Sequence, residues 1–245
     1  ESRSNNPVVR FVSGRTGKDV AATRVADGNW TVAALAKSML EALPQKTQQK
    51  NEYLDLLVKQ EVAFDRKKEA FFSMPCFWAG EVQFANVDGV VGTTAGWVGN
   101  HEVVRVTYDP NVVSYTELVR EAMERNTHIN IYYKDDAEQK AAQDVITERG
   151  ALDVLVKELN EVFSPDGDSK HALRSTSLRF VPLTALQSTK ANRCIAQGRM
   201  VDVVELLSPR QLVLFRAYTV QWMKKDISMV EMTEVPITEG WKITN

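Results

Sequence analysis

Residues 69–110 read EAFFSMPCFWAGEVQFANVDGVVGTTAGWVGNHEVVRVTYDP. This segment begins with a short apolar run, 70–74, which is typical of a buried strand. Residues 76–85 predict a helix that a glycine-containing turn closes. Two strands follow, because 90–98 is apolar between glycines and 102–108 alternates apolar with polar side chains. The segment therefore predicts the order β-α-β-β.

The next residues extend this pattern by a second helix and a further strand. Ser114 and Glu117 have the spacing of a capping box, and an apolar helical face follows them. Residues 129–133 predict the last strand. The resulting order, β-α-β-β-α-β, is that of the ferredoxin-like split unit. We therefore predict an α+β fold whose ferredoxin-like core lies between helical N- and C-terminal extensions.

The regions on either side of this core have a different pattern. Residues 1–29 are polar and lack a sustained period, which predicts an extended arm that lies on its own domain or on a partner. Asn29 or Thr31 can cap a first helix that Pro44 ends, and residues 45–68 predict a second helix with a solvated charged face.

Beyond the core, residues 136–149 and 151–163 predict two helices separated by a glycine. Capping boxes at 184–187 and 208–211 begin two more helices, and 226–245 predicts an irregular or β tail. The predicted domains are 1–68, an extended arm plus a helical extension; 69–150, the α+β core; and 151–245, a helical region with an irregular tail.

The composition is that of an ordinary globular protein. Of 245 residues, 44% are hydrophobic and 25% are charged, and 30 basic side chains face 32 acidic ones. Such an even balance argues against nucleic acid as a partner, and no apolar run is long enough to form a transmembrane segment. The chain begins at Glu1 without a leader; if a targeting segment has been removed, we expect an organelle or a periplasm-like compartment.

The two cysteines, Cys76 and Cys194, are too few for a disulfide scaffold or a four-ligand metal site. Cys76 lies at the predicted strand–helix junction, where amide N–H groups favour thiolate over thiol. It is therefore a candidate nucleophile, and the alternative is a small buried hydrophobe. The three histidines, His101, His128 and His171, are too widely spaced to predict a metal site, and no motif indicates a cofactor.

Two motifs occur in order in the core: Cys76-Phe77-Trp78 with a glutamate three residues later, and Tyr108-Asp109-Pro110 before a Ser-Tyr helix start. Together they resemble the A-type peptide methionine sulfoxide reductases, over about residues 69–150 only. The resemblance implies an oxidoreductase that reduces methionine sulfoxide without a cofactor, as in peptide-methionine (S)-S-oxide reduction. The family's recycling cysteines lie in a C-terminal tail, and because residues 226–245 contain no cysteine, we expect an external thiol reductant.

The resemblance also implies roles for individual residues. Cys76 matches the nucleophile that attacks the sulfoxide sulfur and becomes a sulfenic acid. Phe77 and Trp78 match the aromatic pair that encloses the substrate's methyl group. Glu102 matches the acid that protonates the sulfoxide oxygen, although from the residues alone it is equally an exposed strand residue.

The sequence also departs from the family. Pro75 stands where the family has a glycine, and residues 96–101 replace a long loop that carries a substrate-binding tyrosine. Residues 126–128 lead directly into the next strand, so the family's aspartate and tyrosine in that loop have no counterpart. Cys194 lies within a predicted helix and is expected to be a packed thiol rather than a resolving one.

Two hypotheses remain open. In the first, the chain is a loop-deleted enzyme that uses Cys76. In the second, the core is catalytically degenerate and serves as a structural or docking subunit, with protein partners bound through residues 1–68 and 151–245. The retained motifs favour the first hypothesis, and the lost loops and added regions favour the second.

Overall fold

The computed structural model describes residues 8–25, 31–44, 52–124, 129–151, 153–224 and 231–232. The chain divides into two compact units, Glu1–Asp65 and Arg66–Asn245. Within the described ranges, no helix combines the length and the apolar character that crossing a membrane requires.

The first unit begins with an antiparallel hairpin of β1 (Val9–Val12) and β2 (Asp19–Val25). The expected extended arm is therefore wrong over the described residues 8–25, and the rest of 1–29 lies outside them. A turn with Gly17 at φ 66° joins the strands, and the side chains of Arg10 and Asp19 pair across them at 2.7 Å. The alternation in such a short strand is too brief to be distinguished from an irregular arm.

The described residues of this unit then form two helices, α1 (Val32–Ala42) and α3 (Glu52–Ala63). Thr31 is the N-cap of α1, as predicted, and its hydroxyl accepts a hydrogen bond from the Ala34 amide at 3.1 Å. The second helix ends at Ala63 and not at residue 68, because Lys68 already pairs with a neighbouring strand of the sheet.

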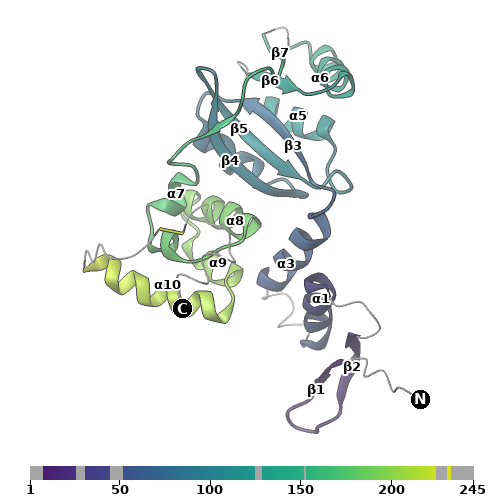
Figure 1. Ribbon diagram of the computed structural model, residues 1–245, viewed down its shortest axis with the longest axis vertical. Helices are drawn as coiled ribbons and strands as arrows, with labels where there is room; N and C mark the ends of the chain where they lie inside the picture. Colours follow the sequence, from purple (N-terminus) through teal and green to yellow (C-terminus); the bar gives the residue numbers. More distant parts are fainter. Residues whose placement is uncertain are drawn as a thin grey trace. The chain divides into compact units, whose positions relative to one another are not determined.

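In the described part of the second unit, the strands form one sheet with the order β7-β6-β3-β5-β4-β8 (Figure 1). Only β6 and β7 run parallel, and the other neighbouring pairs are antiparallel. The strands are β3 (Lys68–Ser73), β4 (Val90–Val98), β5 (His101–Tyr108), β6 (Asn130–Tyr133), β7 (Leu155–Glu158) and β8 (Ser164–Pro165). The mixed helix-and-strand class of the prediction is confirmed.

Three helices alternate with these strands: α4 (Phe77–Phe84), α5 (Tyr115–Glu124) and α6 (Asp136–Arg149). Phe72 points to the face of the sheet that α4 and α5 cover, where it stacks on Phe84 with ring centroids 4.9 Å apart. Phe71 points to the opposite face, where the ring of Phe163 covers it. Because both faces are covered, β3 appears in the sequence as a continuous apolar run.

Two predictions about the region after α6 are wrong. Residues 151–163 do not form a helix, and the strand predicted at 129–133 is not the last. Gly150, at φ 63°, ends α6 and turns the chain back, so that β7 adds to the sheet beside β6. The Leu, Lys and Glu residues of β7 favour helices, and only pairing with β6 makes this segment a strand.

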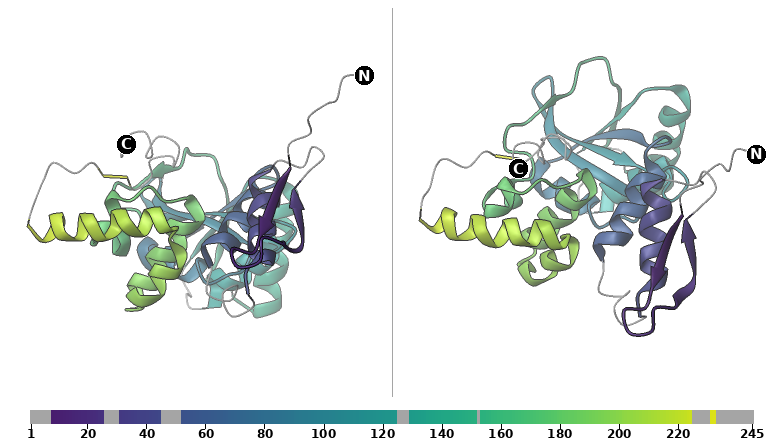
Figure 2. Two further views of the ribbon diagram at one scale, coloured as in Figure 1. Left: turned by 90° about the horizontal axis from the view of Figure 1, so that it is seen from below. Right: turned by 60° about the horizontal axis from the view of Figure 1, so that its bottom comes forward.

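Residues 171–223 form a group of helices around α8, and Figure 2 shows α10 at the edge of this group. The glutamines of both predicted capping boxes, Gln187 and Gln211, cap their helices and also hydrogen bond to each other at 2.9 Å. The elements are α7 (His171–Arg174), η1 (Ser177–Phe180), α8 (Ala185–Ala196), α9 (Met200–Val203), η2 (Val204–Leu206) and α10 (Pro209–Met223). The predicted tail at 226–245 lies outside the described residues, except for 231–232.

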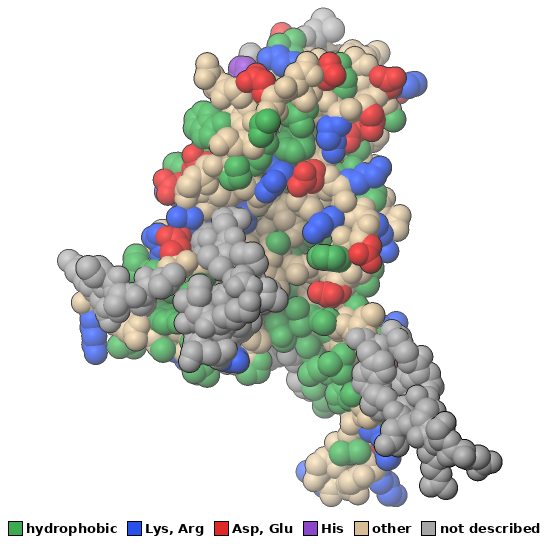
Figure 3. Space-filling view, in the orientation of Figure 1, with side chains coloured by type: hydrophobic (Ala, Val, Ile, Leu, Met, Phe, Trp, Pro, Cys, Tyr) green, Lys and Arg blue, Asp and Glu red, His purple; other side chains and the backbone are tan. Residues whose placement is uncertain are grey.

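The surface carries charges of both signs. Figure 3 shows lysine and arginine side chains interspersed with aspartate and glutamate over the visible face. This distribution agrees with the even charge balance of the sequence.

Candidate functional site

Cys76 lies where β3 gives way to α4. It is the N-cap residue of this helix, with φ −146° and ψ 112°, and its carbonyl accepts the Gly80 amide at 3.0 Å. The thiol is exposed. Cys76 is therefore not a buried hydrophobe, and its position at a helix N-terminus is the one that the sequence predicts.

Glu102 lies directly beside this junction, because β5 is the neighbour of β3 in the sheet. Its carboxylate oxygen Oε2 accepts the backbone N–H of Phe77 at 2.9 Å, and its carbonyl accepts the Met74 amide at 3.1 Å. The fold thus brings together Glu102 and the residues on both sides of Cys76.

Aromatic rings surround the start of α4. Phe77 is buried, and its ring centroid lies 5.4 Å from that of Trp78 and 5.3 Å from that of Trp97. Trp97 belongs to β4, directly across from Glu102 in the sheet. Its indole N–H donates to the Asp166 carboxylate at 3.0 Å. Trp97 and Asp166 also belong to this site, although no local sequence pattern marks either residue.

The segment 163–171 forms one side of the site. Its strand β8 pairs with β4 at Gly96 and Trp97, and the Asp166 amide donates to the Ala95 carbonyl at 2.9 Å. A Cβ atom on Gly96 would lie closer than 3.0 Å to the Phe163 ring and the Ser164 carbonyl. The absence of a side chain at Gly96 therefore permits this close approach.

A buried polar cluster holds the end of this segment against α4. The Glu81 carboxylate accepts hydrogen bonds from the Lys170 ammonium at 2.7 Å, the Lys170 amide at 2.8 Å and the Ser169 hydroxyl at 3.1 Å. The Thr93 hydroxyl also contacts this carboxylate, and the Thr93 carbonyl accepts from the ammonium. The side chains of Glu81 and Lys170 are 0% and 2% exposed, so this ion pair is shielded from water.

The same segment brings His171 to Trp78. The imidazole and the indole stack with centroids 4.1 Å apart and an interplanar angle of 15°. The sequence predicts no role for His171, because the three histidines are too widely spaced for a metal site and nothing local links His171 to a residue 93 positions earlier. The described residues contain no group of three His, Cys, Asp or Glu side chains that could hold a metal ion.

The Tyr-Asp-Pro motif has a structural contact of its own. Asp109, at the end of β5, accepts Arg66 Nε at 2.7 Å and Nη2 at 2.5 Å, and it also accepts the Asn111 amide at 3.0 Å. The hydrogen bond from Arg66 holds the pKa of Asp109 below its ordinary value. Burial raises the pKa of the neighbouring Tyr108 to about 12, so its phenol stays protonated at neutral pH.

Cys194 is remote from this chemistry. It lies inside α8 and is 1% exposed, which agrees with a packed helix thiol. Neither cysteine is in a disulfide.

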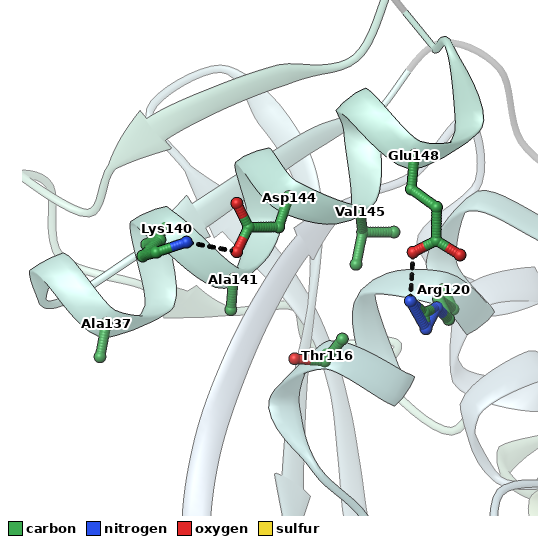
Figure 4. Close-up of a pocket in the computed structure, with 8 residues that line it drawn as sticks. All are labelled: Thr116, Arg120, Ala137, Lys140, Ala141, Asp144, Val145 and Glu148. Atoms are coloured by element: carbon green, nitrogen blue, oxygen red, sulfur yellow. Dashed lines mark hydrogen bonds and ion pairs between the residues drawn. The ribbon is translucent and has the colours of Figure 1, made fainter.

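A separate groove of about 290 Å³ lies between α5 and α6, and none of its lining residues belongs to the Cys76 site (Figure 4). Its charges are paired within the groove: Lys140 binds Asp144 at 2.7 Å, and Arg120 binds Glu148. We assign no chemistry to this groove, because these ion pairs account for its charged groups.

Comparison with known proteins gives partial matches. Over 75 residues the chain is 37% identical to the peptide methionine sulfoxide reductase MsrA of Methanothermobacter thermautotrophicus, which covers 24% of this chain and 44% of the relative. Over 68 residues it is 40% identical to MsrA of Yersinia pestis, and this match covers 21% of this chain and 32% of the relative. The chain thus spans less than half the length of these relatives. No protein-family model matches it.

Solved structures also match part of the chain, including the following two. Mxr1 from Saccharomyces cerevisiae, in an unusual oxidised form, has a TM-score of 0.35 at 17% identity and covers 42% of this chain and 76% of its own. Methionine sulfoxide reductase A of Corynebacterium diphtheriae has a TM-score of 0.37 at 22% identity, and the match covers 46% of this chain and 76% of that structure's chain. The sequence matches carry the assignment: part of this chain is similar to peptide methionine sulfoxide reductase MsrA, as a divergent, partial homologue.

Proposed function

We propose that this chain reduces methionine sulfoxide through a sulfenic acid on Cys76, with Glu102 as the proton donor. One observation carries the proposal: the Glu102 carboxylate binds the amide that directly follows the exposed Cys76, at 2.9 Å. A nucleophile and an acid that are held together at the start of one helix are what sulfoxide reduction needs.

In the proposed reaction, the Cys76 thiolate attacks the electrophilic sulfur of the sulfoxide. An S–S bond forms while the protonated oxygen leaves the substrate sulfur as hydroxide. Hydroxide then adds to the Cys76 sulfur, the S–S bond breaks, and the substrate leaves with that electron pair as the thioether, so that Cys76 becomes a sulfenic acid. Glu102 supplies the proton, and because its Oε2 holds the Phe77 amide, we assign the donation to Oε1. The methionine sulfur gains two electrons, and the cysteine sulfur loses them.

An external thiol then restores the enzyme. A first thiol displaces water from the sulfenic acid and forms a mixed disulfide with Cys76, and a second thiol releases Cys76 and leaves as a disulfide. We expect no internal resolving thiol, because Cys194 is buried in α8.

Phe77 and Trp78 are proposed to contact the substrate's methyl group. A sulfoxide has one polar end and two apolar arms, so an aromatic surface next to the nucleophile directs the oxygen toward the acid. For the core as a whole we propose the ferredoxin-like arrangement, which is supported by the strand order β6-β3-β5-β4 with antiparallel neighbours.

A second candidate function is a docking role for a catalytically degenerate core. It is favoured by apolar side chains on α10 that are largely exposed: Val213 at 65%, Val220 at 52% and Met223 at 78%. Exposed apolar residues on one helix are typical of a surface that binds a partner.

The deciding experiment measures reduction of dabsyl-methionine sulfoxide with dithiothreitol. We expect Cys76→Ser to abolish turnover, Glu102→Gln to lower kcat by ~100-fold or more, and the control Cys194→Ser to retain it. Dimedone should trap the sulfenic acid on Cys76 after one turnover in the absence of thiol. Equal, negligible rates for wild type and Cys76→Ser would exclude the enzyme and leave the docking role.

A further inference from the structure

We propose that the substrate binds in a pocket at Cys76, that His171 forms one wall of this pocket, and that this wall limits the bound group to about the size of a methyl. The imidazole lies parallel to the Trp78 indole, with centroids 4.1 Å apart. This proposal rests on the proposed function for its substrate, but the wall itself can be tested without turnover.

The position of His171 is fixed by buried contacts. It directly follows Lys170, whose ammonium and amide both bind Glu81 at 2.7 and 2.8 Å. Glu81 lies three residues after Trp78, one turn further along α4. The two stacked rings are therefore held by the same helix, and the stack is preorganised rather than a chance surface contact.

The stack decides which aromatic surface remains for a ligand. At 4.1 Å the two rings are in van der Waals contact, so no group can enter between them. The Phe77 ring is also close to the indole, with centroids 5.4 Å apart. In the proposed arrangement, a group that binds against Trp78 next to Cys76 contacts the edge of the imidazole. A larger group would collide with this edge.

In this proposal α4 does not build the pocket alone, because one of its walls comes from a residue outside the helix. His171 belongs to the C-terminal region, and the segment that carries it is held on the core by β8 and by the hydrogen bond from Trp97 to Asp166. We infer that the C-terminal region contributes to substrate selection and not only to stability.

The test uses the reactivity of Cys76 toward two thiol reagents of different size, methyl and benzyl methanethiosulfonate, in a Cys194→Ser background. The Cys76 thiolate attacks the sulfenyl sulfur, an S–S bond forms, and methanesulfinate leaves with the electron pair. We expect His171→Ala to raise the benzyl-to-methyl rate ratio by roughly tenfold, the lower bound for discrimination of one added methylene in a hydrophobic pocket.

Two control variants isolate the wall. His171→Phe keeps an aromatic ring on Trp78 and should keep the wild-type ratio, and Ser175→Ala at the exposed end of α7 should not change it. Near-UV circular dichroism checks that each variant is folded. An unchanged ratio in a folded His171→Ala variant would overturn the proposal. So would an equal increase for both reagents, which would mean that His171 covers Cys76 without discriminating by size.

Turnover supplies the second measurement. The kcat/KM ratio for ethyl against methyl sulfoxides should rise in His171→Ala in the same direction as the labelling ratio. A shifted labelling ratio with no turnover in any variant would support the wall and refute the proposed reduction. Turnover together with an unshifted labelling ratio would support the proposed reduction and refute the wall.

Discussion

Replacing Lys170 by methionine is expected to destabilise the Arg66–Asn245 unit by about 3–5 kcal/mol. The substitution leaves the Glu81 carboxylate at 0% exposure without its ammonium partner. The hydroxyl of Ser169 and the amide of residue 170 still donate to it, which places the expected cost near 3 kcal/mol rather than 5. Solvent screening does not reduce this cost, because neither side chain of the ion pair reaches water.

The assay is equilibrium urea unfolding followed by tryptophan fluorescence and far-UV circular dichroism. Lys140→Met is the matched control, because Lys140 forms an ion pair with Asp144 at the same 2.7 Å but is 76% exposed. We expect that control to cost less than ~0.5 kcal/mol.

A double variant completes the experiment. Glu81→Met combined with Lys170→Met removes both charges together, so it should be less destabilised than either single variant. The reasoning fails if the free energy of unfolding of Lys170→Met stays within ~1 kcal/mol of wild type. It also fails if the destabilisation of the double variant equals the sum of the two single destabilisations.

Three further predictions concern the thiols, the acid end of the pH range and the edge of the sheet. Ellman's reagent should modify only Cys76 in the native protein and both Cys76 and Cys194 in urea, since Cys194 is 1% exposed; two reactive thiols in the native state would contradict the structure. The pKa of Asp109 is lowered in the folded state by Arg66, so its contribution to stability is present above the ordinary carboxyl pKa of ~4 and is lost as pH falls through the lower folded value. Asp109→Asn should therefore lower the free energy of unfolding at pH 7 by roughly 1–2 kcal/mol and flatten its decline below ~pH 4, and an unchanged acid profile would argue against this account. Gly96→Ala places a Cβ atom against Phe163 and Ser164 and should lower the free energy of unfolding by ~1–3 kcal/mol. Faster amide hydrogen exchange in β8 would show the loosened pairing, and native-like protection there would show that the approach at Gly96 is not tight.

Much of the fold follows from local pattern. The strand at 90–98 and the helix at 136–149 have the predicted bounds, and both C-terminal capping boxes form as expected. These features depend on residues at most four positions apart, or on the alternation within one strand, so the sequence carries them directly. The region 151–163 was predicted wrongly because its strand depends on a partner, β6, and not on its own composition.

The candidate site divides in the same way. The sequence by itself determined that Cys76 begins a helix beside two aromatic residues, and its resemblance to a family of reductases singled out Glu102. Only the tertiary structure decided what surrounds them: Lys170 binds Glu81, and His171 stacks on Trp78, across separations of 89 and 93 residues. No local propensity encodes such contacts, because they form only when β8 pairs with β4 and brings the segment 163–171 against α4.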